Sequence, residues 1–398
     1  MTSRSCPRTM AATAACCVWA IAHADGGAVN ALEGFASCSL VRADTLLVPP
    51  GRHELLSDVE IDSTTTVVIR AGATLAIGPG VGILSRGPLH VLGTEAEPVI
   101  FTWLVPGSVW GSVAIAGETA GGSVLRHCTF EHGSSKLFAD SLGASGAFVS
   151  YFADVSLTSC TFSDNTGGDG LNVKYARAIV EDCTFIRQLD AIDFDSPDSC
   201  EIVHSRFYDC EDDAIDLGGP RTSFTACRYN VVENAQDKGF SVQRVSALIE
   251  NNIVVGGHTA LAIKDGADPI VGNNTFVSNS FGIRAYEKDP GGGGGRGTVI
   301  STIIFDSDTA SVYLDSLSTT ALSYSDIENG WTGEGNIDSD PTFATYGGMD
   351  HVLAPGSPCI DAGDPLAEDG IDWPMWYPNG PRADMGAFGG PGADGWLQ

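Results

Sequence analysis

Residues 189–195 read LDAIDFD and residues 212–218 read DDAIDLG, so nearly the same segment occurs twice, 23 positions apart. In both segments, apolar residues alternate with aspartates. Alternation with a period of two is typical of a β-strand that buries one face. The sequence therefore predicts consecutive coils of a repetitive structure, with the aspartates along one outer face.

The repeat extends over much of the chain. One large apolar residue recurs at intervals of 32, 23, 22, 22, 24 and 23 residues. After each recurrence a polar turn leads to a second short strand, and a valine- or isoleucine-rich third strand such as RAIVEDC completes the unit. Three short strands in about 22 residues predict an all-β solenoid with three faces. The recurring residues are Phe130, Phe162, Phe185, Phe207, Tyr229, Ile253 and Phe276, and the second strands are 170–174, 191–195, 214–218, 239–243, 260–264 and 282–286.

These repeats resemble the right-handed parallel β-helix repeats of the pectate-lyase-like superfamily, and the resemblance covers most of residues 60–345. The opening segment TTTVVIRAGATLAIGPGVGI (64–83) and the closing segment SPCIDAGDPLAEDGIDWP (357–374) are similar to segments of exported bacterial β-helix proteins. The resemblance implies a right-handed parallel β-helix with about 22 to 23 residues per coil. It implies little about activity, because function on such scaffolds depends on individual sites.

The start of the chain is typical of an export signal. A basic beginning, an apolar run and the triplet Ala22-His23-Ala24 predict a signal peptide over residues 1–24 and a secreted protein. No other segment approaches the ~20 apolar residues of a membrane span. The expected organisation is completed by an N-terminal cap region (25–59), the β-helix (60–345) and a C-terminal capping segment (346–398).

Composition narrows the range of partners. The formal net charge of −29 repels nucleic acid and anionic membranes. We therefore expect no nucleic acid as a partner, and an extracellular or cell-surface polysaccharide is the favoured one. If that polymer is anionic, a cation must lie between it and the protein.

The cysteines predict buried thiols. Cys128, Cys160 and Cys183 each begin a Cys-Thr-Phe triplet, and Cys227 falls in the same register in the repeat alignment. Cysteine and aromatic two residues apart point to the same side of a strand, so a buried stack of thiols is expected. Cys200 with Cys210 is the most plausible disulfide in an exported chain.

The outward aspartates of neighbouring strands, here called the aspartate ladder, predict a metal site. Neighbouring strands lie ~4.8 Å apart, so Asp193 and Asp216 are expected to be neighbours that repel each other unless a cation lies between them. Calcium is the candidate cofactor, held by Asp193, Asp195 and Asp216, because its oxygen ligands lie at ~2.3 to 2.6 Å. The alternative is an acidic face whose aspartates extend into water.

Sequence segments along this ladder resemble motifs of two enzyme classes. LDAIDF, EDDAIDL, DKGFSV and AIKD follow the order of the polygalacturonase motifs, which implies Asp190, Asp212 and Asp213 as acid and base and Lys264 as a contact for a substrate carboxylate. Two positions depart from that family: Lys238 replaces its histidine and Ala262 its arginine. The short turns around the ladder favour binding over catalysis.

The second resemblance is to chondroitinase-B-like and alginate lyases, through Lys264 and Arg284 on adjacent coils. It implies a base that removes the proton next to a uronate carboxylate and a cation that stabilises the resulting charge. Polysaccharide binding is the main prediction, and whether a reaction follows is left open. The candidate catalytic residues are Asp190, Asp193, Asp213, Asp216, Lys264 and Arg284.

Overall fold

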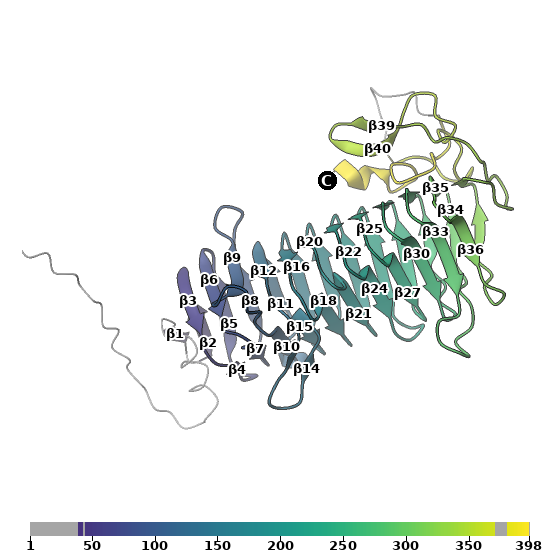
Figure 1. The fold of residues 1–398 in the computed structure, drawn as a ribbon. Helices are drawn as coiled ribbons and strands as arrows, with labels where there is room; N and C mark the ends of the chain where they lie inside the picture. Colours follow the sequence, from purple (N-terminus) through teal and green to yellow (C-terminus); the bar gives the residue numbers. More distant parts are fainter. Residues whose placement is uncertain (1–38, 43, 371–379, 398) are drawn as a thin grey trace, which may run out of the picture.

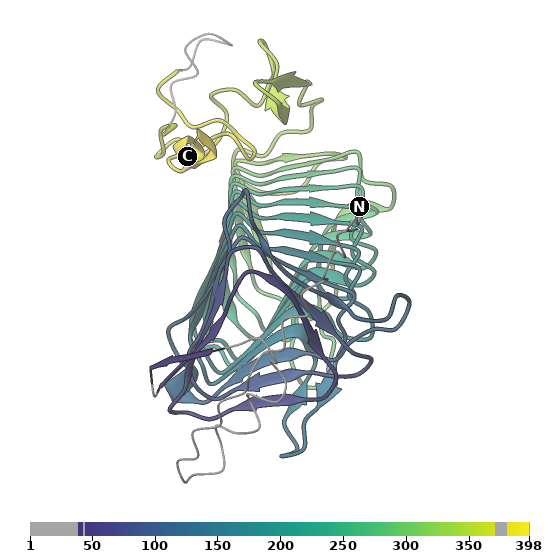
Figure 2. The same ribbon diagram turned by 90° about the vertical axis from the view of Figure 1, so that its left-hand side faces the viewer.

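The computed structural model describes residues 39–42, 44–370 and 380–397, so the expected signal peptide lies outside the described residues. The described chain winds into a long coil whose three walls are sheets of 13, 11 and 12 strands, all parallel except that β1 pairs antiparallel with β2. Figure 1 shows the coils stacked along one axis, and Figure 2 shows their triangular cross-section. The predicted three-faced β-solenoid is confirmed.

The strands of the three sheets are short. The 13-stranded sheet contains β1 (Ser39–Arg42), β2 (Thr45–Val48), β5 (Thr66–Arg70), β8 (Leu89–Leu92), β11 (Ser123–Arg126), β16 (Val155–Thr158), β19 (Ala178–Glu181), β22 (Ser199–Val203), β25 (Phe224–Arg228), β28 (Ser246–Glu250), β31 (Ile270–Gly272), β34 (Thr298–Ile300) and β37 (Ala321–Ser323). The 11-stranded sheet contains β4 (Val59–Ile61), β7 (Ile83–Ser85), β10 (Val113–Ala116), β15 (Gly146–Tyr151), β18 (Asp169–Lys174), β21 (Ile192–Asp195), β24 (Asp213–Gly218), β27 (Lys238–Gln243), β30 (Thr259–Lys264), β33 (Phe281–Tyr286) and β36 (Ala310–Leu314). The 12-stranded sheet contains β3 (Gly51–Leu55), β6 (Ala73–Ile77), β9 (Val99–Trp103), β12 (Cys128–Glu131), β17 (Thr161–Ser163), β20 (Thr184–Ile186), β23 (Arg206–Tyr208), β26 (Val231–Glu233), β29 (Ile253–Val255), β32 (Thr275–Val277), β35 (Ile303–Phe305) and β38 (Asp326–Ile327).

A stack of phenylalanine rings fills the core beside the 12-stranded sheet. Phe101, Phe130, Phe162, Phe185 and Phe207 are fully buried, and successive ring centroids lie 4.4 to 5.0 Å apart. Parallel strands in register place equivalent side chains directly above one another, which explains the stack. The first three intervals of the predicted repeat, from Phe130 to Phe207, follow from this stacking.

The predicted alignment is wrong at Tyr229 and Ile253. The residues in register with Phe207 are Val232 and then Val254. A longer turn before β25, over residues 219–223, delays the next coil. The predicted alignment therefore selects a residue three positions too early in the first of these coils and one position too early in the second.

The same shift removes one cysteine from the predicted thiol stack. Cys128 and Cys160 are buried with their sulfur atoms 3.3 Å apart, and Cys183 is buried in the following coil. Cys227 instead lies in β25 of the 13-stranded sheet, between Ile202 and Ile249.

The expected disulfide is not formed, since Cys200 and Cys210 are both free and buried. Cys200 belongs to β22 in the 13-stranded sheet, whereas Cys210 follows β23 in the 12-stranded sheet.

Two excursions leave the regular coil beside the 11-stranded sheet. Residues 134–145 form the first excursion and carry the hairpin β13 (Lys136–Leu137) and β14 (Gly143–Ala144). Residues 287–297 form the second and include five consecutive glycines, 291–295. The glycine-rich excursion is held by Asp265, which accepts hydrogen bonds from the backbone of Lys288 and Asp289 at 2.7 and 2.9 Å.

The chain after residue 340 folds back along the side of the coil (Figure 1). It contains the hairpin β39 (Phe343–Tyr346) and β40 (Met349–Leu353) and the 3-10 helix η2 (Ala393–Leu397). A second 3-10 helix, η1 (Glu118–Ala120), follows β10. Apolar residues of this segment cover the outer side of Ile253 and Ile303 in the 12-stranded sheet.

Candidate functional site

The outer face of the 11-stranded sheet carries most of the predicted site residues. In its strands the inward residues, such as Ile215 and Leu217, are fully buried in the core. The residues between them form columns along the coil axis, because Asn172, Asp193 and Asp216 are consecutive partners in the ladder. Asp193 and Asp216 are therefore neighbours, as predicted.

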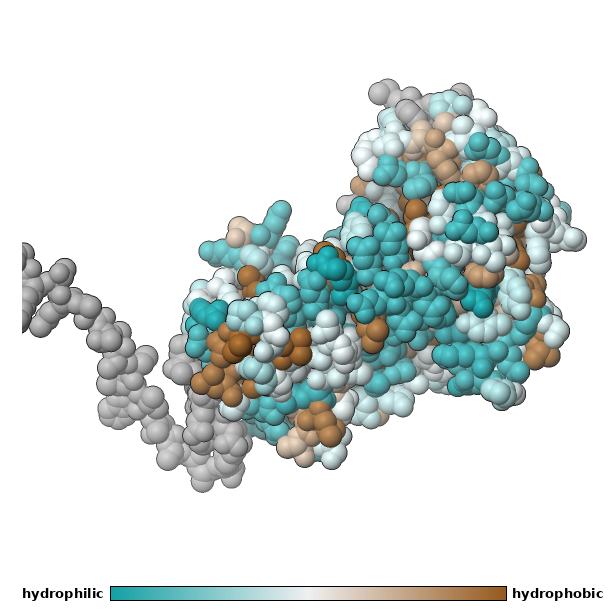
Figure 3. Space-filling view, in the orientation of Figure 1, coloured by the Kyte–Doolittle hydropathy of each residue, from teal (hydrophilic) through white to brown (hydrophobic). Residues whose placement is uncertain are grey.

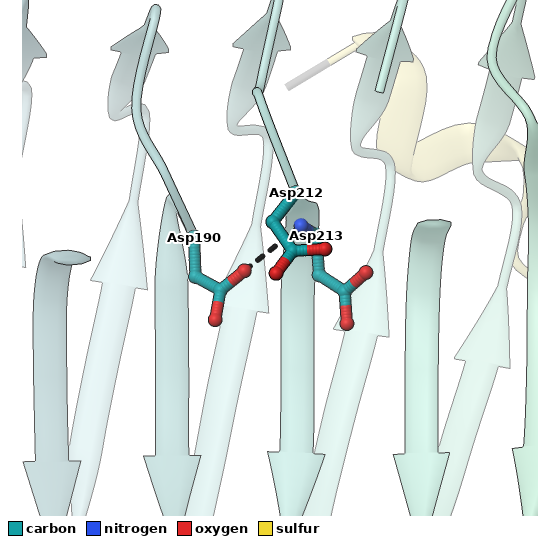
Figure 4. A group of neighbouring side chains, drawn as sticks. All are labelled: Asp190, Asp212 and Asp213. Atoms are coloured by element: carbon teal, nitrogen blue, oxygen red, sulfur yellow. Dashed lines mark hydrogen bonds between the residues drawn. The ribbon is translucent and has the colours of Figure 1, made fainter. Parts of the chain in front are cut away.

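Three carboxylates converge at the amino-terminal ends of two adjacent strands of this sheet, β21 and β24. Asp190, Asp212 and Asp213 each offer an oxygen atom, and these atoms all lie within 4.8 Å of one another. Figure 4 shows them at the start of two adjacent strands. The Asp213 amide donates a hydrogen bond of 2.8 Å to Asp190 Oδ1, which holds the two coils in this register. Three carboxylates at this separation have the ligand chemistry that calcium prefers.

The electrostatics of this acidic triad are unfavourable without a cation. Burial, and to a smaller extent the nearby Asp213 carboxylate, raise the pKa of Asp190 to about 8, while the hydrogen bond from the Asp213 amide opposes that shift. Burial also raises the pKa of Asp213 to about 6, against the opposing effect of Lys238. The Lys238 ammonium lies 3.1 Å from Asp213 Oδ1 and also pairs with Asp237. Lys238 was not among the predicted site residues, although its position beside Asp237 and one coil after Asp213 could have indicated it.

The predicted calcium ligands have neighbours of their own. Asn172 donates a hydrogen bond of 2.7 Å to Asp193, and Lys174 forms a 2.7 Å ion pair with Asp195. Burial, and then the nearby Asp195 carboxylate, raise the pKa of Asp193 to about 9. Among the described residues, the group of carboxylates close enough to share an ion is Asp190, Asp212 and Asp213, and this predicted set is not part of it.

Lys264 lies on the same face and is almost completely buried. Its side chain is 1% exposed and donates a hydrogen bond of 2.6 Å to Ser241 Oγ. Ser241 in turn donates to Asp216 at 2.6 Å, and Lys264 Nζ lies 3.9 Å from the same carboxylate. Burial lowers the pKa of Lys264, although Asp216 opposes that shift.

Arg284 lies one strand further along, in the column of Asp216 and Ser241. Its guanidinium carbon lies 4.7, 5.1 and 5.9 Å from the ring centroids of Phe281, Tyr286 and Tyr313. The ladder pairs Arg284 with Ala262, and Lys264 with Tyr286, so the two basic residues occupy neighbouring columns.

Comparison with known proteins supports the fold. The family model described as "Right handed beta helix region" matches residues 110–281. None of the curated protein sequences matches this chain. Among the described residues, no helix is long and apolar enough to cross a membrane.

Three solved structures illustrate the similarity. Dettilon tailspike protein (gp208) aligns at 12% identity and a TM-score of 0.48, over 69% of this chain and 61% of the tailspike. Pectate lyase Pel9A aligns at 14% identity and a TM-score of 0.42, over 80% and 88% of the two chains. A PL6 alginate lyase in complex with a trisaccharide aligns at 12% identity and a TM-score of 0.43, over 81% and 87%. The repeat, the three parallel sheets and the family match together identify this chain as a right-handed parallel β-helix.

Proposed function

We propose that the protein is exported and binds an extracellular or cell-surface polysaccharide that carries carboxylates, through a divalent cation at Asp190, Asp212 and Asp213. The observation that carries this proposal is the convergence of three carboxylate oxygens within 4.8 Å on the outer face. Calcium is the cation that best fits an all-oxygen ligand set. A bound cation offsets the repulsion between these carboxylates and leaves coordination positions for a polymer carboxylate.

The same separation argues against hydrolysis with inversion at this triad. An inverting glycosidase needs its two carboxyl groups ~6.5 to 9.5 Å apart, so that a water molecule fits between them. The acidic triad is tighter than that. The triad therefore does not fit inverting hydrolysis, whereas a shared ion fits oxygen atoms this close together.

Calcium titration of purified residues 25–398 by calorimetry tests the binding site. We expect calcium to raise the melting temperature and to permit retention of the protein on immobilised polygalacturonate or alginate. Asp190→Asn and Asp212→Asn should each abolish both effects. Asp182→Asn is the matched control, because Asp182 is exposed at the turn between β19 and β20, away from this face. Calcium binding that survives both triad substitutions would disprove the proposed ligand set.

A second candidate function is β-elimination of a uronate polymer, and the lowered pKa of Lys264 favours it. A lysine that loses its proton more readily can act as the base, while a cation neutralises the substrate carboxylate. Because the Lys264 side chain is only 1% exposed, binding remains the first proposal. An enzyme of this class would release unsaturated products that absorb ultraviolet light. Lys264→Met should abolish that signal, whereas Lys174→Met on the same face should retain it.

A further inference from the structure

A pocket lies at the other end of this face, beneath the excursion 134–145. Phe138 of the excursion is 2% exposed and packs against Leu84, Ala114 and Val149, which belong to the outer side of the 11-stranded sheet. Residues 140–142 of the excursion and the ends of β10 and β15 line the pocket together, and Figure 1 shows the excursion beside these two strands. In Figure 3, hydrophobic residues gather around this excursion, whereas the middle of the visible surface is mainly hydrophilic. The pocket has a volume of about 340 Å³, within the usual size range of small-ligand sites.

One wall of the pocket is an aromatic ring. Gly117, Phe152 and Tyr175 occupy the same turn position in three consecutive coils, directly after β10, β15 and β18. The Phe152 and Tyr175 rings stack with centroids 4.9 Å apart and an interplanar angle of 16°. Gly117 has no side chain to continue the stack, and a Cβ atom placed on it would meet nothing within 4 Å. The face of Phe152 that is turned toward the Gly117 coil is therefore left open to the pocket.

The lining of the pocket also includes a polar pair. Arg86, from the end of β7, forms an ion pair with Asp140 at the tip of the excursion, and both line the pocket. The guanidinium offers several donors and the carboxylate offers several acceptors. A wholly apolar ligand would remove water from this pair without replacing its hydrogen bonds, which is costly. The pocket therefore suits a ligand with one apolar face and hydroxyl groups around its edge.

We propose that this pocket is a sugar-binding subsite, in which one pyranose ring stacks on Phe152 and its hydroxyls bond to Arg86 and Asp140. The inference rests on the proposed polysaccharide function and extends it along the coil. β10 and β21 are three strands apart in the sheet, which is roughly 14 Å along the coil axis at the usual strand spacing, and the sites are also offset across the sheet because the triad lies at the start of its strands and the pocket at the end of β10 and β15. A polymer chain running along the outer face from the acidic triad would reach the pocket only if it is long enough.

The test compares short and long oligogalacturonates by isothermal titration calorimetry in calcium. Phe152→Ala should weaken binding of the long oligomers roughly tenfold, as expected for the loss of a central aromatic contact, and leave the short ones unchanged. Phe152→Trp keeps an aromatic face and should keep the affinity. Phe224→Ala is the matched control, because Phe224 is similarly exposed (40% against 47%) but belongs to the 13-stranded sheet.

The outcomes separate the two proposals. Calcium-dependent binding of the oligomers by the unmodified protein would support the proposed function. If Phe152→Ala then weakens binding of short and long oligomers equally, or changes the binding of neither, the subsite is disproved while the proposed function stands. If the unmodified protein binds none of them, both proposals fail. Length-dependent loss with Phe152→Ala, and retention with Phe152→Trp, would establish the subsite.

Discussion

Asp326 illustrates at the residue scale how the last coil holds a buried carboxyl group. It is fully buried in β38, where Oδ2 accepts a hydrogen bond of 3.1 Å from Cys359 Sγ and Oδ1 accepts one of 3.1 Å from the Ser339 amide. Burial raises the pKa of Asp326 to about 6, while these two hydrogen bonds oppose that shift. The residue therefore connects the end of the coil with the segment that follows it.

The raised pKa predicts a pH dependence of stability. The folded state holds the Asp326 proton more tightly than the unfolded state, whose pKa is near the ordinary value of 3.8. The contribution of Asp326 to the free energy of unfolding is therefore largest below about pH 4. It falls by at most about 3 kcal/mol as the pH rises through 6. Asp326→Asn should remove that component. Urea unfolding of both proteins at several pH values checks it; an unchanged difference between acidic and neutral pH would contradict the prediction.

At the scale of the elements, a column of asparagines joins consecutive coils. Asn230, Asn252 and Asn274 are fully buried at the turn between the 13- and 12-stranded sheets. Asn252 Oδ1 accepts a hydrogen bond of 3.0 Å from the Asn230 amide, and its Nδ2 donates one of 2.9 Å to the Cys227 carbonyl. Each side chain thus satisfies backbone groups that the turn leaves without partners in the sheets.

Asn252→Ala should lower the free energy of unfolding by roughly 2 kcal/mol or more, because buried backbone groups lose their partners. Asn252→Ser should cost less, since the Ser205 hydroxyl serves the same position one coil before Asn230, where it accepts a hydrogen bond of 3.2 Å from the Cys183 amide. Thermal melts of the two variants give the comparison. Equal losses would show that the column contributes through packing and not through its hydrogen bonds.

At the scale of the whole molecule, the last part of the chain covers an apolar surface. The outer side of the 12-stranded sheet presents Ile253, Ile303 and Phe305, and these residues pack against Val352, Met385 and their neighbours. Asn251 fixes the position by donating hydrogen bonds of 2.9 Å to the carbonyls of Ala387 and Gly389. Without this cover the coil would expose a contiguous apolar patch.

Truncation after residue 340 is expected to cause self-association, measured by light scattering. Adding Ile303→Ser and Phe305→Ser to the truncated chain should restore a monodisperse protein, because both side chains then tolerate water. A truncated chain that stays monodisperse without these substitutions, and melts at the same temperature, would show that the cover is dispensable.

The sequence by itself determined the strands, their inward and outward sides and the stack of coils. These properties depend on a local period of two and a spacing near 22 residues, which residues 189–195 and 212–218 already display. It also placed the aspartates on one outer face, and the ladder pairing of Asp193 with Asp216 confirms that placement.

Only the tertiary structure decided which groups meet. The longer turn at 219–223 replaced Tyr229 by Val232 in the core, and the proximity of Asp190, Asp212 and Asp213 depends on how two turns fold toward each other. The pocket at Phe152 requires an excursion to cross the sheet and Gly117 to leave a space. Such contacts depend on loop paths and on residues distant in the chain, and no local period encodes them.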